Sequence, residues 1–294
     1  MEPATPQVSV LIPVFNDEQR LATCLEALEQ QTCPDDFYEV IVIDNASTVD
    51  IQSVVKRFPR ARYCYEGRQG SYAARNKGLE IATGEILAFT DSDCIPANDW
   101  LERGVAALQD NPDCGLVGGA IRVFYKNPAR PTAVELYESL RAFPQQRYIE
   151  QDHFGATANV FTHRRIFDAV GDFNAELKSG GDAEWGKRVA AAGYPLCYAD
   201  DVVVMHPARS TFAEYYTKTL RVMSGLPAFR RKDIPRRVVV GQLLKGLIPP
   251  LSGIKRIMAE ARENTGLEKL KLTSVVLFLH YLWIFESARL QFRR

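Results

Sequence analysis

The sequence predicts an α/β protein with a mostly parallel central sheet. Short runs rich in Val and Ile recur between residues 8 and 125, and segments with helical spacing of apolar residues separate them. Continuous apolar runs are typical of strands whose two faces are both covered, and the intervening helices supply that cover. We therefore expect a Rossmann-like sheet flanked by helices, followed by a C-terminal helical extension.

The expected elements alternate along the first half of the chain. Strands are expected at 8–15, 39–45, 61–66, 85–91 and 115–125, and helices at 18–30, 51–58 and 71–82. In the first of these helices Leu21, Leu25 and Leu28 recur at helical spacing, which indicates one buried face. Asp99 has the residue type of an N-cap, so another helix is expected after it.

Charge divides the chain into two regions. The formal net charge of the 294 residues is zero. From Lys218 to Arg294 there are 16 Lys or Arg and 5 Asp or Glu, whereas residues 1–217 hold 20 and 31. Such an asymmetry indicates regions with different partners. We expect one domain over 1–215 and a helical, basic region over 216–294.

The stretch after Thr211 consists of apolar runs edged by Lys and Arg. Its longest uninterrupted apolar run is Val275–Leu279, and Leu272–Phe285 falls short of the roughly 20 residues that span a bilayer. We therefore expect a basic amphipathic helix on an anionic cytoplasmic membrane surface. A helical cap on the sheet, or a homo-oligomer contact, explains the pattern equally well. The clusters Arg230–Lys232 and Arg236–Arg237 are either solvated or lipid-facing.

Several common kinds of site are not expected. The six cysteines form no CxxC pair and do not cluster with the four histidines, so neither disulfides nor zinc are expected. With an N-terminus that shows no secretory signal, the thiols are read as reduced and the protein as cytoplasmic. The sequence has no GxxxxGK[ST], no GxGxxG after the first strand and no GxSxG. This disfavours P-loop, dinucleotide-binding and α/β-hydrolase sites.

Polar clusters follow three of the expected strands, at 16–18, 44–47 and 91–93. Each alone is typical of a turn, but three at the carboxyl edge of one sheet favour a ligand site. Asp91 and Asp93 stand one residue apart at the end of an apolar run. Paired carboxylates repel and lose solvation when buried, so a cation is expected there. Such a cation can hold phosphate oxygens where a glycine-rich loop is missing.

Four segments in this order resemble the family 2 inverting glycosyltransferases with the GT-A fold: VSVLIPVFNDEQRLATCLEALEQQT, VIVIDNAST, GSYAARNKGLEIATGEILAFTDSDC and SGGDAEWGKRVAAAG. The resemblance covers roughly residues 7–210. It implies Mn²⁺ or Mg²⁺ and a nucleotide-sugar donor, commonly a UDP-sugar. The implied acceptor is a saccharide or lipid-linked saccharide in polysaccharide or glycolipid synthesis. No segment indicates nucleic-acid binding beyond bare charge.

The resemblance implies a role for each matching residue. The residues implied to contact the donor are Pro13, Phe15, Asn16, Glu18, Asp44, Asn45, Ser47, Gly70, Arg75, Asn76, Asp91 and Ser92. Those implied to hold the metal are Asp93, Asp91 and His206, and those implied on the acceptor side are Gly155, Ala156, Asn159, Glu184 and Trp185. Asp182 is implied to be the catalytic base, although Gly181 stands where the family has the first residue of an acidic pair.

These roles have structural alternatives. Asp182 is a good N-cap for the helix that follows it, Trp185 has the character of a core residue, and a lone histidine such as His206 is often structural. Two other functions also remain open. One is a nucleotidyltransferase, which usually has a glycine-rich turn with basic residues after its first strand. The other is a non-catalytic subunit that binds a carbohydrate or nucleotide.

Overall fold

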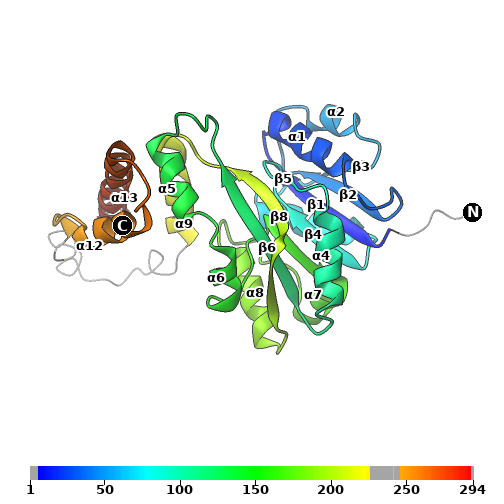
Figure 1. Cartoon of the computed structure of the whole chain (residues 1–294). Helices are drawn as coiled ribbons and strands as arrows, with labels where there is room; N and C mark the ends of the chain where they lie inside the picture. The colour runs from blue at the N-terminus through cyan, green and yellow to red at the C-terminus, as the bar shows by residue number, and fades with distance from the viewer. Residues whose placement is uncertain (1–5, 226–240, 242–245, 293–294) are drawn as a thin grey trace, which may run out of the picture. The chain divides into compact units, whose positions relative to one another are not determined.

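The computed structural model describes residues 6–225, 241 and 246–292 and confirms the α/β class (Figure 1). Its strands are β1 Val8–Val14, β2 Tyr38–Asp44, β3 Ala61–Tyr65, β4 Ile86–Thr90, β5 Ile95–Pro96, β6 Leu116–Phe124, β7 Asn159–His163 and β8 Leu196–Pro207. Its helices are α1 Glu18–Glu29, α2 Ile51–Val55, α3 Ser71–Ile81, α4 Trp100–Gln109, α5 Ala133–Arg141, α6 Gln145–Glu150, α7 Arg164–Val170, α8 Gly181–Ala191, α9 Phe212–Gly225, α12 Leu251–Glu260 and α13 Gly266–Phe292.

Within the described residues the strands form one mixed sheet in the order β3-β2-β1-β4-β7-β6-β8-β5. β1 pairs in parallel with β2 and β4, and β2 pairs in parallel with β3. In this register Val14 lies opposite Asp44, so the carboxyl ends of β1 and β2 meet at one edge. Beyond β4 the pairing becomes antiparallel, through β7. The residues that follow β1, β2 and β4 therefore share one edge of the sheet.

The alternation of side chains along each strand builds two cores. On one face Val10 and Ile12 of β1 pack with side chains of α1, α2 and α4. On the other face Leu11 of β1 packs with side chains of α3, α7 and α8. Both faces are buried, which explains why β1 and β2 are mostly apolar. The polar residues Ser9 and Glu39 within them satisfy each other, because the Ser9 hydroxyl donates to Glu39 Oε1 at 2.8 Å. Each fully buried Val, Leu or Ile contributes about 1.5–3 kcal/mol from apolar burial.

The antiparallel strand β7 is fastened by one buried amide. Asn159 accepts a hydrogen bond from Trp100 Nε1 at 2.9 Å and donates to Ala120 O and Val202 O at 2.9 and 2.8 Å. These bonds join α4, β6 and β8 through a side chain that is fully buried. Asp99 stands at the N-cap position of α4 as expected, but its carboxylate pairs with Arg103 rather than with the helix backbone.

The chain divides into two compact units, and the boundary differs from the expected one. The first unit comprises 1–122 and 143–206, and the second comprises 123–142 and 207–294. The excursion at 123–142 belongs to the second unit, because Leu136 of α5 is buried with Ile257 of α12 and Leu272 of α13. Its buried Glu138 also pairs with Arg209 and Lys218, at 2.9 and 2.7 Å. These partners are distant in sequence, so the linear pattern of residues gives no sign of the excursion.

The C-terminal helix α13 is longer than the apolar segment Leu272–Phe285 that the sequence analysis considered. It runs for 27 residues, and Gly266–Arg289 is long and apolar enough to cross a membrane by length and composition alone. The sequence argument was wrong because isolated Thr, Ser, His and Tyr residues interrupt an apolar run without interrupting a helix. The structure does not show α13 as a basic amphipathic helix, because its apolar side chains lie on buried and exposed faces alike. Val275 and Leu282 are buried, whereas Leu270 and Phe285 are exposed. The clusters Arg230–Lys232 and Arg236–Arg237 lie outside the described residues.

Candidate active site

The turns after β1 and β2 are tied together by hydrogen bonds. Asn16 adopts a positive φ of 51°, which asparagine tolerates better than most residues. Its backbone N–H donates to Ser47 Oγ at 2.9 Å, and its Oδ1 accepts from Thr48 N at 2.7 Å. Two polar clusters that the sequence places about 30 residues apart therefore form one rigid corner of the sheet edge.

Asp44, the last residue of β2, is buried, and both of its carboxylate oxygens accept hydrogen bonds. Asp44 accepts from Ser47 N and from the Tyr63 hydroxyl, both at 2.9 Å. Burial and the bond to Asp44 raise the pKa of Tyr63 to about 12. The neighbouring Asn45 accepts from Gly70 N at 2.7 Å and donates to Arg68 O at 2.7 Å. Asp44 and Asn45 thus hold the turn residues and the loop that precedes α3.

The other residues implied to contact the donor differ in exposure. Phe15 is exposed beyond β1, Glu18 begins α1, and Ser92 is buried after β4. Pro13 is buried within β1, at a position beyond the pairing of that strand with β4. Gly70 is the N-cap of α3 with a φ of 135°, a conformation that favours glycine. Their contacts with a donor stay predictions.

The first aspartate after β4 already has a cationic partner. Arg75 of α3 is buried, and its Nη2 donates to Asp91 Oδ1 at 2.5 Å. Its Nε has no hydrogen-bond partner among the described residues. The next residue, Asn76, exchanges two hydrogen bonds with the backbone of Phe173, so its amide is engaged in holding that loop. Arg75 therefore neutralises Asp91, and Asn76 fastens the loop that contains Phe173.

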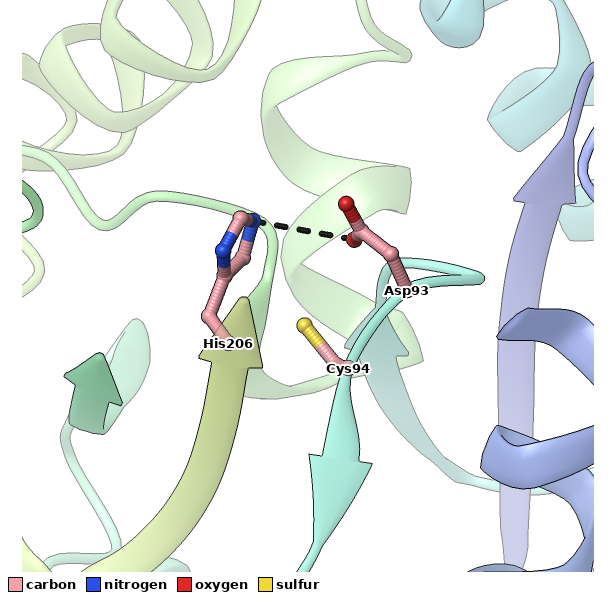
Figure 2. A group of neighbouring side chains, drawn as sticks. All are labelled: Asp93, Cys94 and His206. Carbon is pink, nitrogen blue, oxygen red and sulfur yellow. Dashed lines mark ion pairs between the residues drawn. The ribbon is translucent and has the colours of Figure 1, made fainter. Parts of the chain in front are cut away.

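The second aspartate faces a different environment, which Figure 2 shows. Asp93 Oδ1 lies 3.6 Å from Nε2 of His206 on β8, and Asp93 Oδ2 lies 3.6 Å from Nη1 of Arg20. His206 is buried beside the ring of Phe143, with a centroid separation of 4.5 Å. Burial raises the pKa of the Asp93 carboxyl, while His206 opposes that rise. The predicted metal residues Asp93 and His206 are thus brought together from distant parts of the chain.

Cys94 joins this pair, and the sequence analysis missed it. Ligand atoms of Asp93, Cys94 and His206 all lie within 4.8 Å of one another (Figure 2). Cys94 is fully buried, and its Sγ lies 3.9 Å from Ala158 O. The expectation that cysteine and histidine do not cluster is wrong for this pair, because β8 returns His206 to the turn after β4. The only signal in the sequence was the position of Cys94 directly after Asp93.

The proposed base lies on α8, but not at its cap. Gly180, with a φ of 78°, is the N-cap, so the expectation that Asp182 caps this helix is wrong. Asp182 Oδ1 accepts from the Tyr72 hydroxyl at 3.1 Å and from Ala183 N at 2.9 Å. Burial raises the pKa of Asp182, while the Ala183 N–H, the charge of Arg75 and the Tyr72 bond oppose the rise. A carboxylate with a raised pKa is a stronger general base.

Two of the residues expected on the acceptor side belong to the core instead. Trp185 is buried, stacks on Phe167 at a centroid separation of 4.4 Å and donates from Nε1 to Gly171 O at 3.0 Å. Asn159 is fully buried, and its amide is taken up by the bonds that fasten β7. Both side chains are engaged within the protein, and their roles toward an acceptor stay predictions. Their residue types fit a sugar site as well as a core, which is why the sequence did not separate the two roles.

The other acceptor-side predictions remain untested by contacts. Glu184 is partly exposed and pairs with Arg188 on the same helix, at 2.8 Å. Ala156 is buried and donates from its backbone N–H to Gln145 Oε1 at 3.0 Å. Gly155 is buried, and a Cβ there would lie 2.8 Å from Val160 Cγ2. Glu184 is therefore the member of this set whose side chain has the clearest access to solvent.

Comparison with known proteins agrees with this geometry. The model of the family described as glycosyl transferase family 2 matches residues 9–171. Glycosyltransferase AglE of Haloferax volcanii is 40% identical over 230 residues, which cover 76% of this chain and 74% of that protein. A dolichyl N-acetyl-α-D-glucosaminyl phosphate 3-β-D-2,3-diacetamido-2,3-dideoxy-β-D-glucuronosyltransferase of Methanococcus voltae is 24% identical over 227 residues, covering 72% and 70%.

Solved structures share the fold. The mannosyltransferase PcManGT from Pyrobaculum calidifontis, in complex with GDP-Man and Mn²⁺, superposes with a TM-score of 0.60 at 23% identity. That match covers 98% of this chain and 85% of the other. Residues 1–349 of TarS from S. aureus give a TM-score of 0.52 at 19% identity, covering 78% and 67%. The chain belongs to glycosyl transferase family 2 and is a glycosyltransferase with the GT-A fold.

Proposed function

We propose that this glycosyltransferase is metal-dependent and inverting. In this proposal it transfers a sugar from a nucleoside diphosphate sugar, a UDP-sugar in the first instance, to a hydroxyl of a saccharide or lipid-linked saccharide. The observation that carries the proposal is the convergence of Asp93 and His206, with Asp182 on a separate element of the same unit. The divalent cation and nucleotide-sugar in the complex of PcManGT support it.

Asp93 and His206 fit a divalent cation. Their facing atoms are 3.6 Å apart, close to the roughly 3–3.5 Å that separates two neighbouring ligands of one ion. Stabilising the negative charge of a departing diphosphate is the chemistry that Mn²⁺ or Mg²⁺ supplies when bound. Asp91 is already neutralised by Arg75, so the cation is needed to balance Asp93 rather than Asp91. The Asp91–Arg75 pair ties the turn after β4 to α3.

Asp182 is the residue that this proposal assigns to proton transfer. A single displacement places the attacking hydroxyl opposite the leaving group, so the base and the metal residues must come from different elements. Asp182 comes from the start of α8, whereas Asp93 follows β4. Tyr72 donates to one carboxylate oxygen and leaves the other to accept the proton of the acceptor hydroxyl. The single displacement inverts the anomeric centre, giving a β-linked product from an α-linked donor.

The second unit is proposed to lie on an anionic membrane surface. Its described part exposes Leu247, Ile248, Leu251, Leu267, Leu270, Tyr281, Trp283 and Phe285. Several of these lie together, because the Tyr281 hydroxyl is 3.4 Å from Leu247 O and a ring nitrogen of His280 is 3.1 Å from Ile248 O. Exposed apolar side chains in a segment with 16 basic and 5 acidic residues favour an anionic lipid interface. A peripheral position on the cytoplasmic face would bring the enzyme to lipid-linked acceptors.

Replacing the proposed base tests the central assignment. Asp182→Asn should lower the rate of sugar transfer about 100-fold or more, because the amide cannot accept the acceptor proton. Binding of the donor, measured by calorimetry with Mn²⁺ and UDP-sugars, should stay within about threefold of the native value. Asp168→Asn, which changes an exposed carboxylate on α7 of the same unit, is the matched control and should retain most activity. Transfer by Asp182→Asn within a few-fold of the native rate would show that another group is the base.

The pH dependence of transfer offers a second test. A base works when it is deprotonated, so kcat/KM should fall as the pH drops through the raised pKa of Asp182. The Tyr72 hydrogen bond holds that pKa down, so Tyr72→Phe should raise it further and move the acidic limb of the profile to higher pH. Tyr198→Phe, which removes a hydroxyl that donates to Asp200 at 2.9 Å on β8, is the control and should leave the limb in place. An acidic limb that moves to lower pH in Tyr72→Phe would contradict the assignment.

Vesicle flotation tests the membrane proposal on the full chain. Substituting Leu247, Ile248 and Phe285 by Ser should reduce binding to vesicles that contain an anionic lipid by about tenfold or more. Each substitution removes apolar surface that would otherwise be buried against the lipid. Tyr65→Ser, which removes an exposed aromatic residue from the catalytic unit, is the control and should bind as the native chain does. Equal flotation of the native chain and the triple variant would rule out this surface.

A further inference from the structure

The centre around Asp93 offers three chemically different donors. They are a carboxylate oxygen, a thiol sulfur and an imidazole nitrogen, supplied by Asp93, Cys94 and His206 within 4.8 Å of one another. Asp93 and Cys94 come from the turn between β4 and β5, and His206 comes from β8 (Figure 2). Cys94 and His206 are both buried. The hydrogen bond from the sulfur to Ala158 O is long, at 3.9 Å, so the thiol is weakly engaged as a donor.

A sulfur donor changes which cations such a centre prefers. Hard ions such as Mg²⁺ and Mn²⁺ favour oxygen, whereas a thiolate favours borderline or soft ions such as Zn²⁺, Co²⁺ and Cd²⁺. Cysteine, histidine and carboxylate together form a common Zn²⁺ ligand set. Two ligands at about 2.1 Å from a tetrahedral ion lie roughly 3.4 Å apart. The 3.6 Å between Asp93 Oδ1 and His206 Nε2 is close to that spacing.

We propose that Cys94 is a third metal ligand that makes this centre bind Zn²⁺ more tightly than Mn²⁺. The inference rests on the proposed function, because it uses the centre that Asp93 and His206 form there. A tetrahedral ion with three protein ligands has one open position. A six-coordinate ion with the same three ligands has three open positions. Zn²⁺ held by all three residues therefore inhibits transfer that Mn²⁺ supports.

Cobalt absorption tests the ligand directly, without reference to sugar transfer. Co²⁺ added to the metal-free full chain should produce a thiolate-to-metal charge-transfer band in the near ultraviolet. Cys94→Ser should lose this band and bind Zn²⁺ about 10–100-fold more weakly, with Mn²⁺ affinity changed by less than about threefold. Cys24→Ser is the matched control, since Cys24 is equally buried, lies 3.7 Å from Asp91 O and is outside the three-ligand group. It should keep the band.

Two further readouts keep the inference falsifiable. Circular dichroism shows whether Cys94→Ser is folded, and Cys94→Ala replaces it if it is not. In the native chain, Zn²⁺ should inhibit Mn²⁺-supported transfer competitively with Mn²⁺. A native protein without the cobalt band, or a band that persists in the folded Cys94 variant, overturns the inference. A native chain that shows the band but transfers no sugar with any Mn²⁺ and nucleotide-sugar combination keeps the three-ligand site and overturns the proposed function instead.

Discussion

Parallel pairing of β1 with β2 and β4 is the constraint on which the rest of the catalytic unit depends. It aligns three carboxyl ends at one edge and delivers the turns at 16–18, 44–47 and 91–93 to the same place. Helices cover both faces of these strands, so the strand residues are mostly apolar and the polar side chains concentrate at and beyond the carboxyl ends. The polar side chains of the site lie at the carboxyl ends of the strands. The two apolar cores fix these strands, and so they fix the positions of the polar side chains.

Two aspartates one residue apart meet this constraint in different ways. Asp91 is neutralised within the protein, by a buried arginine of α3. Asp93 faces His206 and Arg20 at longer distances of 3.6 Å, where the balance of charge depends on what binds. A carboxylate with a close guanidinium partner is a fixed part of the site. A carboxylate with a buried imidazole and a thiol beside it is suited to an exchangeable cation.

The sequence predicted the parallel half of the sheet well, because buried strands and the helices between them leave strong local patterns. It did not predict that 123–142 joins the C-terminal unit, since that depends on long-range packing of Leu136 and on the buried Glu138 meeting Arg209 and Lys218. Within the site, the meeting of Asp93 and His206 followed from the family resemblance. Cys94 was missed because its importance comes from β8 folding back. Asn159 and Trp185, which were expected on the acceptor side, are buried, and residue type alone does not reveal burial.

The measurement that tests this account most directly is the binding of Mn²⁺ to the full chain in the presence of UDP, followed by electron paramagnetic resonance of free Mn²⁺. The account predicts that Asp93→Asn and His206→Ala each weaken Mn²⁺ binding by about tenfold or more. Asp99→Asn, a carboxylate on the same stretch of chain that pairs with Arg103, should leave it unchanged. Native affinity in both the Asp93 and the His206 variants would contradict the claim that these two residues form the metal centre.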